Sequence, residues 1–182
     1  MVNTGRRQRN RAARHSQLVS AAGSIVAEKG LDGLTMGEVA ERVDCAVGTI
    51  YTYFSSKSAL LAALQVEAIR VLADSYGCAA NQWDLALGAL DIEEPTAALA
   101  RLVAMGRLVV GWQHIQPLEF GFLQMLSMSR DRQLEPKDND AVLPMVLALF
   151  AEGRVLHDHA VEVGAIGQDM DQPGNDGTSR TI

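Results

Sequence analysis

The chain has 182 residues, of which 48% are apolar and 5% aromatic. This length and composition fit a helical globular protein with a real core, and they exclude a chain that is disordered over most of its length. No apolar run approaches the about 18 residues that a membrane helix needs, and the basic N-terminus lacks the apolar stretch of a secretory signal. Two distant cysteines, Cys45 and Cys78, suggest no disulfide framework, so we expect a cytoplasmic protein with no membrane partner.

The formal net charge of −6 conceals an asymmetry between the two ends of the chain. Residues 1–57 hold eight Lys and Arg against five Asp and Glu, a net charge of +3, whereas residues 58–182 hold eight against seventeen, a net charge of −9. The first fourteen residues contain five arginines and no acid: Arg6, Arg7, Arg9, Arg11 and Arg14. A basic head on an acidic body predicts that one end of the protein meets a polyanion.

The N-terminal third predicts a basic arm followed by three helices. We expect residues 1–10 to be disordered. Apolar residues at helical spacing predict a helix over residues 11–29, which Gly30 ends. The segment Thr35-Met36-Gly37-Glu38 fits a capping box, in which the threonine hydroxyl and the glutamate each satisfy a backbone N–H, and it predicts a second, short helix. A third short helix is expected over Val47–Phe54.

The rest of the chain also predicts helices. A long helix is expected from Lys57 to about Tyr76, capped by Ser55 or Ser56. The later elements expected are an irregular stretch with a short helix over residues 77–95, helices over 94–114 and 118–128, a charged loop over 130–140, and a last helix over 141–164 with Pro144 in its first turn. No run alternates with period two for long enough to form a convincing strand, so the expected fold class is all-α.

The second and third helices, joined by the three residues 44–46, have the spacing of a helix-turn-helix unit. In such units the second helix enters the major groove of DNA. Hydroxyl groups on its outer face can donate to phosphates, threonine methyls can touch thymine, and a glycine lets the backbone approach closely. Lys57 begins the next helix, where its ammonium and the helix N-terminus can both meet a phosphate. The outward residues expected on the third helix are Val47, Gly48, Thr49, Tyr51, Thr52 and Tyr53.

Residues 14–61 resemble the TetR family of bacterial transcriptional regulators. The resemblance rests on Leu18-Val19-x-Ala21-Ala22, Glu28-Lys29-Gly30, Leu34-Thr35-Met36, Val39-Ala40, Gly48-Thr49-Ile50-Tyr51-x-Tyr53-Phe54 and Lys57-x-x-Leu60-Leu61. It implies an all-helical dimer, usually a repressor, whose C-terminal domain binds a small-molecule inducer. It also implies phosphate contacts by Thr35, Thr49, Tyr53 and Lys57, and places Val47, Gly48 and Thr52 at or near base edges.

The turn between the two short helices departs from the family pattern. Where the family usually has Ala-Gly-Val-Ser, this chain has Val43-Asp44-Cys45-Ala46. We expect Asp44 to adopt the left-handed backbone conformation, which Asp tolerates better than most residues. Ala46 in place of serine loses a helix cap worth about 1 kcal/mol, unless Asp44 caps one residue early. The Asp44 charge also lies near the DNA backbone, so both changes are expected to weaken binding.

The C-terminal two-thirds shows no catalytic motif and offers only a candidate ligand pocket. Met and aromatic side chains adapt to varied apolar ligands, although each of them is also an ordinary core residue. The candidate pocket residues are Met105, Trp112, Phe120, Met125 and Met145. The segment His157-Asp158-His159 is a poor metal site, because residues i and i+2 of a helix point apart. We therefore expect no metal, no cofactor and no enzymatic activity.

These observations predict a transcriptional regulator with three parts: a DNA-binding head over residues 1–57, a helical regulatory domain over 58–165, and a polar tail over 166–182. The expected function is a repressor that a small apolar or amphipathic ligand releases from double-stranded operator DNA. The resemblance implies a homodimer built from the last two helices, but the last predicted helix ends near Gly164, so we expect those helices to be missing. Two alternatives are a truncated interaction partner of a full-length regulator and a small helical ligand-binding protein without DNA activity.

Overall fold

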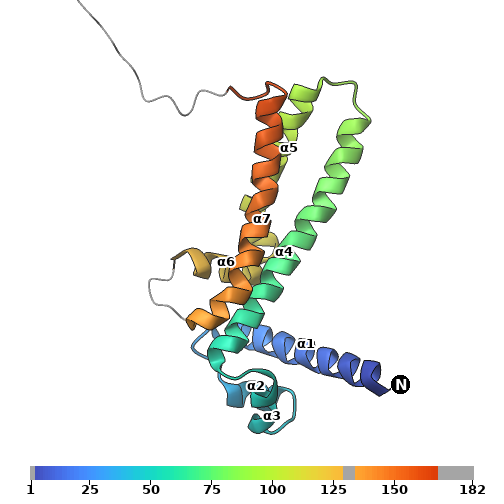
Figure 1. Ribbon diagram of the computed structural model, residues 1–182. Coiled ribbons are helices and arrows are strands. Elements are labelled where there is room, and N and C mark those ends of the chain that lie inside the picture. Colours follow the sequence, from blue (N-terminus) through green and yellow to red (C-terminus); the bar gives the residue numbers. More distant parts are fainter. Residues whose placement is uncertain (1–2, 129–133, 168–182) are drawn as a thin grey trace, which may run out of the picture.

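The structure, a computed structural model, describes residues 3–128 and 134–167, and the protein is all-α over these ranges (Figure 1). The expected fold class is therefore confirmed. Within the described residues, no helix combines the length and apolarity that crossing a membrane requires. The helices are α1 Asn3–Lys29, α2 Met36–Arg42, α3 Val47–Tyr53, α4 Lys57–Gly88, α5 Glu94–Ile115, α6 Pro117–Met128 and α7 Pro136–Glu162.

Helix α4 is the axis of the molecule. Its 32 residues give a rod about 48 Å long, which packs against α1 near its start and against α5, α6 and α7 along its length. Figure 1 shows α1, α2 and α3 gathered at one end of this rod, with α5 and α7 running beside the rest of it. We call α1–α3 the head and the remaining helices the body.

A single buried cluster of apolar side chains runs through the head and the body. In the head, Leu18 and Ile25 of α1 and Ile50 of α3 are fully buried. In the body, Leu72 of α4 and Trp112 of α5 belong to the same cluster. Burying a large apolar side chain contributes about 1.5–3 kcal/mol, so this cluster fixes how the head sits on α4.

The expectation of a disordered arm over residues 1–10 is wrong. Helix α1 begins at Asn3 and continues without a break to Lys29, where Gly30 ends it with φ +69°. Between Arg6 and Val26 the chain offers mainly good or tolerable helix formers and no proline. The only glycine in that stretch, Gly23, lies where α1 is buried against α4, and a Cβ there would make an ordinary contact with Leu64.

Helix α4 does not end near Tyr76, and the irregular stretch expected after it is largely helical. The helix continues to Gly88, despite Gly77, because Tyr76, Ala80 and Trp83 extend its apolar face at helical spacing. These side chains pack at least partly buried in the body. Tertiary packing thus offsets the about 1 kcal/mol that a mid-helix glycine costs.

The last helix starts earlier than expected. Helix α7 begins at Pro136, inside the segment expected to be a charged loop, and Pro136 takes the first helical position where its missing N–H costs nothing. Pro144 consequently lies inside the helix rather than in its first turn. Residues 129–133 of the expected loop, and residues 168–182 of the expected tail, lie outside the described residues.

A polar joint connects the start of α4 to the start of α7. Ser58 is buried, accepts a hydrogen bond of 2.7 Å from the backbone N–H of Glu135, and donates one to the carboxylate of Asp138. Glu135 is the N-cap residue of α7, which has no side-chain cap of its own. Ser58 therefore fixes the position of α7 at the place where the head joins the body.

We predict that Ser58→Ala lowers the free energy of unfolding by about 1–3 kcal/mol, because it leaves two partly buried polar groups without their partner. Urea denaturation of the purified chain measures this change. Ser55→Ala, a matched control at an exposed serine three residues earlier, should change stability by less than about 0.5 kcal/mol. If the two variants were equally stable, the hydrogen bonds of Ser58 would not stabilise the junction between α4 and α7.

Candidate nucleic-acid interface

The α2–α3 unit is held by short-range hydrogen bonds. The Thr35 hydroxyl caps α2 by accepting a 3.0 Å hydrogen bond from the Glu38 N–H. The other half of the expected capping box is replaced, because the Glu38 carboxylate pairs with Lys29 of α1. The cap thus sets where α2 begins, and the ion pair ties α2 to α1.

The turn before α3 has the backbone that the sequence predicts. Asp44 has a φ of +51°, which confirms the left-handed conformation, and the following Cys45 N–H donates to the Ala40 carbonyl at 3.0 Å. Ala46 is the N-cap residue of α3 and makes no side-chain cap hydrogen bond. Because Asp44 is in the left-handed conformation, it does not supply the cap, and α3 begins without one.

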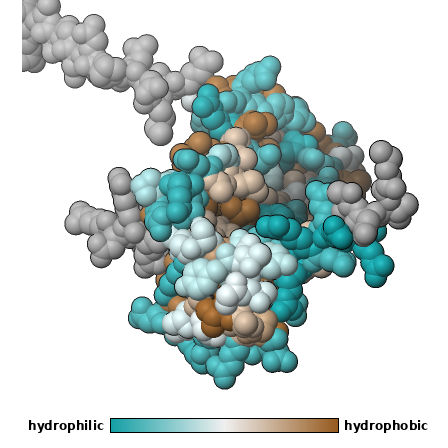
Figure 2. All heavy atoms as spheres, turned by 60° about the horizontal axis from the view of Figure 1, so that its bottom comes forward, coloured by the Kyte–Doolittle hydropathy of each residue, from teal (hydrophilic) through white to brown (hydrophobic). Residues whose placement is uncertain are grey.

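Helix α3 has one buried and one open face. Ile50 is fully buried and the following C-cap residue, Phe54, is almost so, which anchors the helix in the head. On the open face Tyr51 keeps 53% of its surface exposed, and Val47 keeps 42%. With the head turned forward, Figure 2 shows a pale patch of residues of intermediate hydropathy, with hydrophilic residues at its sides and a small hydrophobic cluster below it.

The other predicted contact residues lie around this face in different ways. Gly48 and Thr52 are exposed, and the Thr52 hydroxyl donates to the Gly48 carbonyl at 3.2 Å. Thr49 and Tyr53 are half-buried, with the Arg11 guanidinium 5.7 Å from the centre of the Tyr53 ring. The residues expected on the outer face of α3 are therefore all at least partly accessible.

Thr35 and Lys57 lie outside α3 but beside the same loop. Thr35 is exposed at the start of α2, and Lys57 is exposed at the start of α4. The Lys57 ammonium donates to the Leu31 carbonyl at 3.4 Å, just before Thr35 in the chain. Two of the predicted phosphate contacts are thus close to one loop of the head.

The body contains a cavity of about 660 Å³ between α4, α5 and α7. Its apolar wall includes Tyr76 and Trp83, which meet edge to face with ring centres 6.1 Å apart. Three of its polar lining residues form ion pairs: Arg101 donates to Asp84 at 2.8 Å and to Glu94 at 3.2 Å. The cavity is large enough for a small organic ligand.

Acidic groups dominate the electrostatics of this cavity. Burial raises the pKa of Tyr76, and the negative charges of Glu152 and Asp84 raise it further. A hydrogen bond from His159, whose Nε2 lies 2.9 Å from Glu94 Oε1, is the largest influence that lowers the pKa of Glu94. The lining thus contains three carboxylates and one arginine, Arg101.

The predicted pocket residues are only partly brought together. Met145 lines the body cavity. Trp112 is 2% exposed and donates to the Ser75 hydroxyl at 3.3 Å as a core residue, Met105 lies against Gly153, and Phe120 is half-buried in the core. The side chain of Met125 lies outside the described residues. Sequence reasoning missed Tyr76 and Arg101 as lining residues, although the helix expected from Lys57 already reached Tyr76 and could have located the first.

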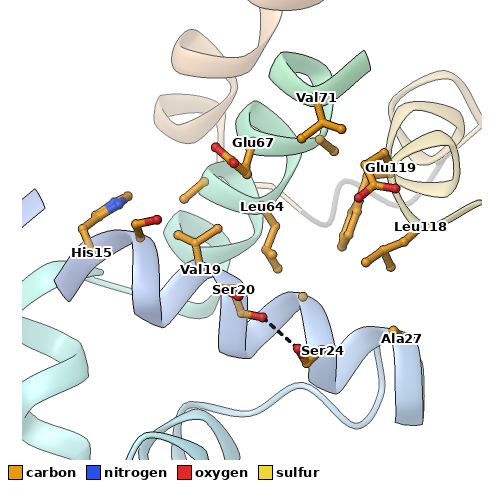
Figure 3. A pocket seen from close by; sticks show the side chains of 15 residues that line it. His15, Val19, Ser20, Ser24, Ala27, Leu64, Glu67, Val71, Leu118 and Glu119 are labelled. Atoms are coloured by element: carbon orange, nitrogen blue, oxygen red, sulfur yellow. Dashed lines mark hydrogen bonds between the residues drawn. The ribbon is translucent and has the colours of Figure 1, made fainter. Parts of the chain in front are cut away.

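A second hollow of about 420 Å³ lies where the head meets the body. Figure 3 shows Val19, Ser20 and Ser24 of α1 facing Leu64 of α4 and Leu118 of α6 across it. Small side chains on α1 leave this space open. Among the described residues, no three His, Cys, Asp or Glu side chains lie close enough together to hold a metal ion.

Comparison with known proteins assigns a family to the segment that forms this head. Residues 18–64 match the model of the bacterial regulatory proteins of the tetR family. The HTH-type transcriptional regulator YvdT of Bacillus subtilis strain 168, itself uncharacterized, is 36% identical over 53 residues. This alignment covers 29% of the chain and 27% of YvdT, so the chain spans about a quarter of the length of that relative.

Two solved structures share the fold of nearly the whole described chain. A TetR family regulator from Vibrio parahaemolyticus superposes with a TM-score of 0.53 at 20% identity, over 81% of this chain and 70% of that one. The multidrug binding protein EbrR, complexed with imidazole, superposes with a TM-score of 0.51 at 18% identity, over 82% and 83%. The helix-turn-helix segment over residues 18–64 thus matches the tetR family of bacterial regulatory proteins, and the chain shares the helical fold of these two solved structures.

Proposed function

We propose that this regulator represses transcription by binding operator DNA as a homodimer, and that a small amphipathic ligand in the body cavity releases it. Residues 1–57 would bind the DNA and residues 58–165 would sense the ligand. The observation that carries this proposal is the open face of α3, which is anchored from behind by Ile50. Helix α4 supports the coupling, because it starts at Lys57 in the head and lines the cavity in the body.

The exposed glycine of α3 supports a close approach by DNA. A Cβ added at Gly48 would meet nothing within 4 Å, so the fold itself does not require a glycine there. Alanine at that position would favour the helix by about 1 kcal/mol. A glycine that costs stability and fills no structural need is explained by a partner that touches the backbone. Val47, Gly48 and Thr52 would then meet base edges, with Tyr51 beside them.

The remaining contacts of this proposal would be to phosphates. Thr35 and Thr49 offer hydroxyls, Tyr53 offers a phenol, and Lys57 offers an ammonium next to the N-terminus of α4. Hydroxyl and ammonium donors at the rim of a major-groove helix set the register of a protein on DNA. A binding selection from a random 30-base-pair duplex library tests the proposal: the purified chain should enrich one sequence. Enrichment of no sequence would overturn it.

We predict that Gly48→Ala separates stability from DNA binding. The variant should unfold at a higher urea concentration, with a gain of up to about 1 kcal/mol. Its affinity for the selected duplex, measured by fluorescence anisotropy, should fall at least about tenfold, or 1.4 kcal/mol. The matched control is Gly121→Ala in α6, where an added Cβ also meets nothing within 4 Å. Equal affinity of the two variants would exclude a backbone contact at Gly48.

A homodimer is supported by two apolar stripes on adjacent helices. On α7, Leu143, Leu147 and Phe150 recur at helical spacing and each keeps more than half of its surface exposed. On α5, Leu99, Val103 and Val110 form a similar exposed stripe. Val142 and Leu149 of the same helix are buried and face the core instead. A second copy would cover the stripes and place two recognition helices on two half-sites.

We predict that the chain sediments as a dimer at a concentration of about 10 µM. A dimer with a dissociation constant of that size has an association free energy of about −7 kcal/mol. Leu147→Glu should raise the dissociation constant at least about tenfold, because it buries a charge in the interface. Ala141→Glu, which adds the same charge to a different exposed face of α7, should leave it unchanged. Sedimentation of the native chain as a monomer at that concentration would contradict the dimer.

The proposed ligand is an amphipathic cation. Aromatic and aliphatic side chains form the apolar wall of the body cavity, while Asp84, Glu94 and Glu152 exceed the single positive charge of Arg101. An acidic, partly enclosed site favours a positively charged ligand. The similarity to a multidrug binding protein that was captured with imidazole supports a small aromatic or cationic ligand.

We predict that tetraphenylphosphonium binds at least about tenfold more tightly than tetraphenylborate, an anion of the same shape. The chain has two tryptophans, so Trp112→Phe leaves only Trp83, whose fluorescence should be quenched on binding. The bound cation should also lower the affinity of the chain for the selected duplex. Because the two binding events are linked, the duplex should lower the affinity of the chain for the cation by the same factor. If the cation bound without changing the affinity of the chain for DNA, the proposal that this ligand releases the chain from DNA would be wrong.

A further inference from the structure

Helix α1 is longer than the head needs. Its buried side chains begin at Leu18, whereas nearly every described side chain from Gly5 to Gln17 is exposed. Figure 1 shows this N-terminal half projecting sideways from the base of α4, with its free end away from the body. The projecting half carries five arginines and no acid.

These arginines are not evenly distributed around the helix. Leu18 and Ile25 mark the face of α1 that points into the core. Towards the N-terminus the same face continues with three arginines, spaced three or four residues apart: Arg14, Arg11 and Arg7. The face that holds α1 in the head therefore becomes a stripe of arginines beyond α3. Arg9 lies on the opposite side of the helix and Arg6 lies about 120° from Leu18, outside the stripe, because each residue turns the helix by about 100°.

Contacts show where this arginine stripe lies. The Arg11 guanidinium is 5.7 Å from the centre of the Tyr53 ring, at the end of α3. One turn further along α1, the His15 ring centre lies 4.8 Å from that of Phe54, the C-cap residue of α3. The stripe thus passes beside the C-terminal end of the recognition helix, and Arg7 lies about 6 Å beyond Arg11 along the axis.

The other cations of the head are largely neutralised within the protein. Arg42 donates two hydrogen bonds of 2.7 Å to Glu28, and these hydrogen bonds hold the pKa of Glu28 below its usual value. Lys29 pairs with Glu38. Among the described residues of the head, the positive charges left without an ion pair are the five arginines of α1, to which the start of α4 adds Lys57.

We propose that Arg7, Arg11 and Arg14 extend the DNA-contact surface of α3 and bind the phosphates that flank the half-site. The inference rests on the proposed function, because it needs α3 in the major groove. A DNA duplex carries one negative charge per about 1.7 Å of its axis, so a helix alongside the recognition helix meets several phosphates. The helix holds the three guanidinium groups at fixed spacing, which lowers the entropy lost when they bind.

Two double variants test the arginine stripe with equal loss of charge. Arg7→Gln with Arg11→Gln removes two charges from the stripe, and Arg6→Gln with Arg9→Gln removes two charges from outside it. Glutamine has nearly the helix propensity of arginine, and circular dichroism melting verifies the fold. The affinity for the selected duplex is measured at several salt concentrations. In the proposed dimer the stripe pair removes four phosphate contacts, two from each protomer, so the magnitude of the slope of log K against log salt should fall by about 3.6, and the Arg6 and Arg9 pair should leave it nearly unchanged.

The single variants Arg7→Gln and Arg9→Gln exclude an indirect effect through Tyr53, because only Arg11 contacts that ring. Arg7→Gln removes one contact from each protomer of the dimer and should lower the magnitude of the slope by about 1.8, whereas Arg9→Gln should not change it. Trimming the selected duplex to the half-sites should weaken DNA binding by the native chain, and it should weaken binding by the stripe pair, which keeps Arg14, by a smaller factor. Equal effects of the two pairs, or none, would overturn the inference while the selected sequence still supports the proposed function. Failure to select any sequence would instead contradict the proposed function itself.

Discussion

One continuous helix, α4, supplies side chains to the core of the head and to the core of the body. Leu60 and Leu64 near its start, and Ile69 and Leu72 further along, belong to the same buried cluster as Leu18 of α1 and Trp112 of α5. Protein interiors are packed as densely as organic crystals, so they transmit displacements rather than absorb them. Because α4 is continuous between the two parts, a change in how α5 or α7 packs on it would be passed to the head.

The polar joint at Ser58 is a second connection between the head and the body, at the point where α4 leaves the head. Ser58 holds the start of α7 by a hydrogen bond from Glu135 and one to Asp138. Lys57, the residue proposed to bind a phosphate, is its neighbour in the chain. The cavity lies further along the same pair of helices, between α4 and α7. A ligand that separates these helices would act on the joint and, through it, on the orientation of α3.

Charge is arranged so that only one end of the protein suits DNA. Residues 58–182 carry a net charge of −9, so the body is repelled by phosphates. In the head, all acids lie from Glu28 onward, and two of them, Glu28 and Glu38, are neutralised by Arg42 and Lys29. The arginines of α1 are left to face outward beside α3. The charge distribution would therefore turn the head towards the DNA before any side chain contacts a base.

The sequence by itself determined the features that short-range chemistry controls. The Thr35 cap, the stop at Gly30, the left-handed turn at Asp44 and the missing cap at Ala46 follow from residues within one or two turns of each other, and all are present. Tertiary structure decided the lengths of α1, α4 and α7 and the position of the cavity. Gly77 and Pro144 predict breaks or ends locally, but packing against distant helices keeps both segments helical. The cavity joins Tyr76 to Met145, and which helix faces meet across so long a separation depends on the folded core rather than on any local pattern.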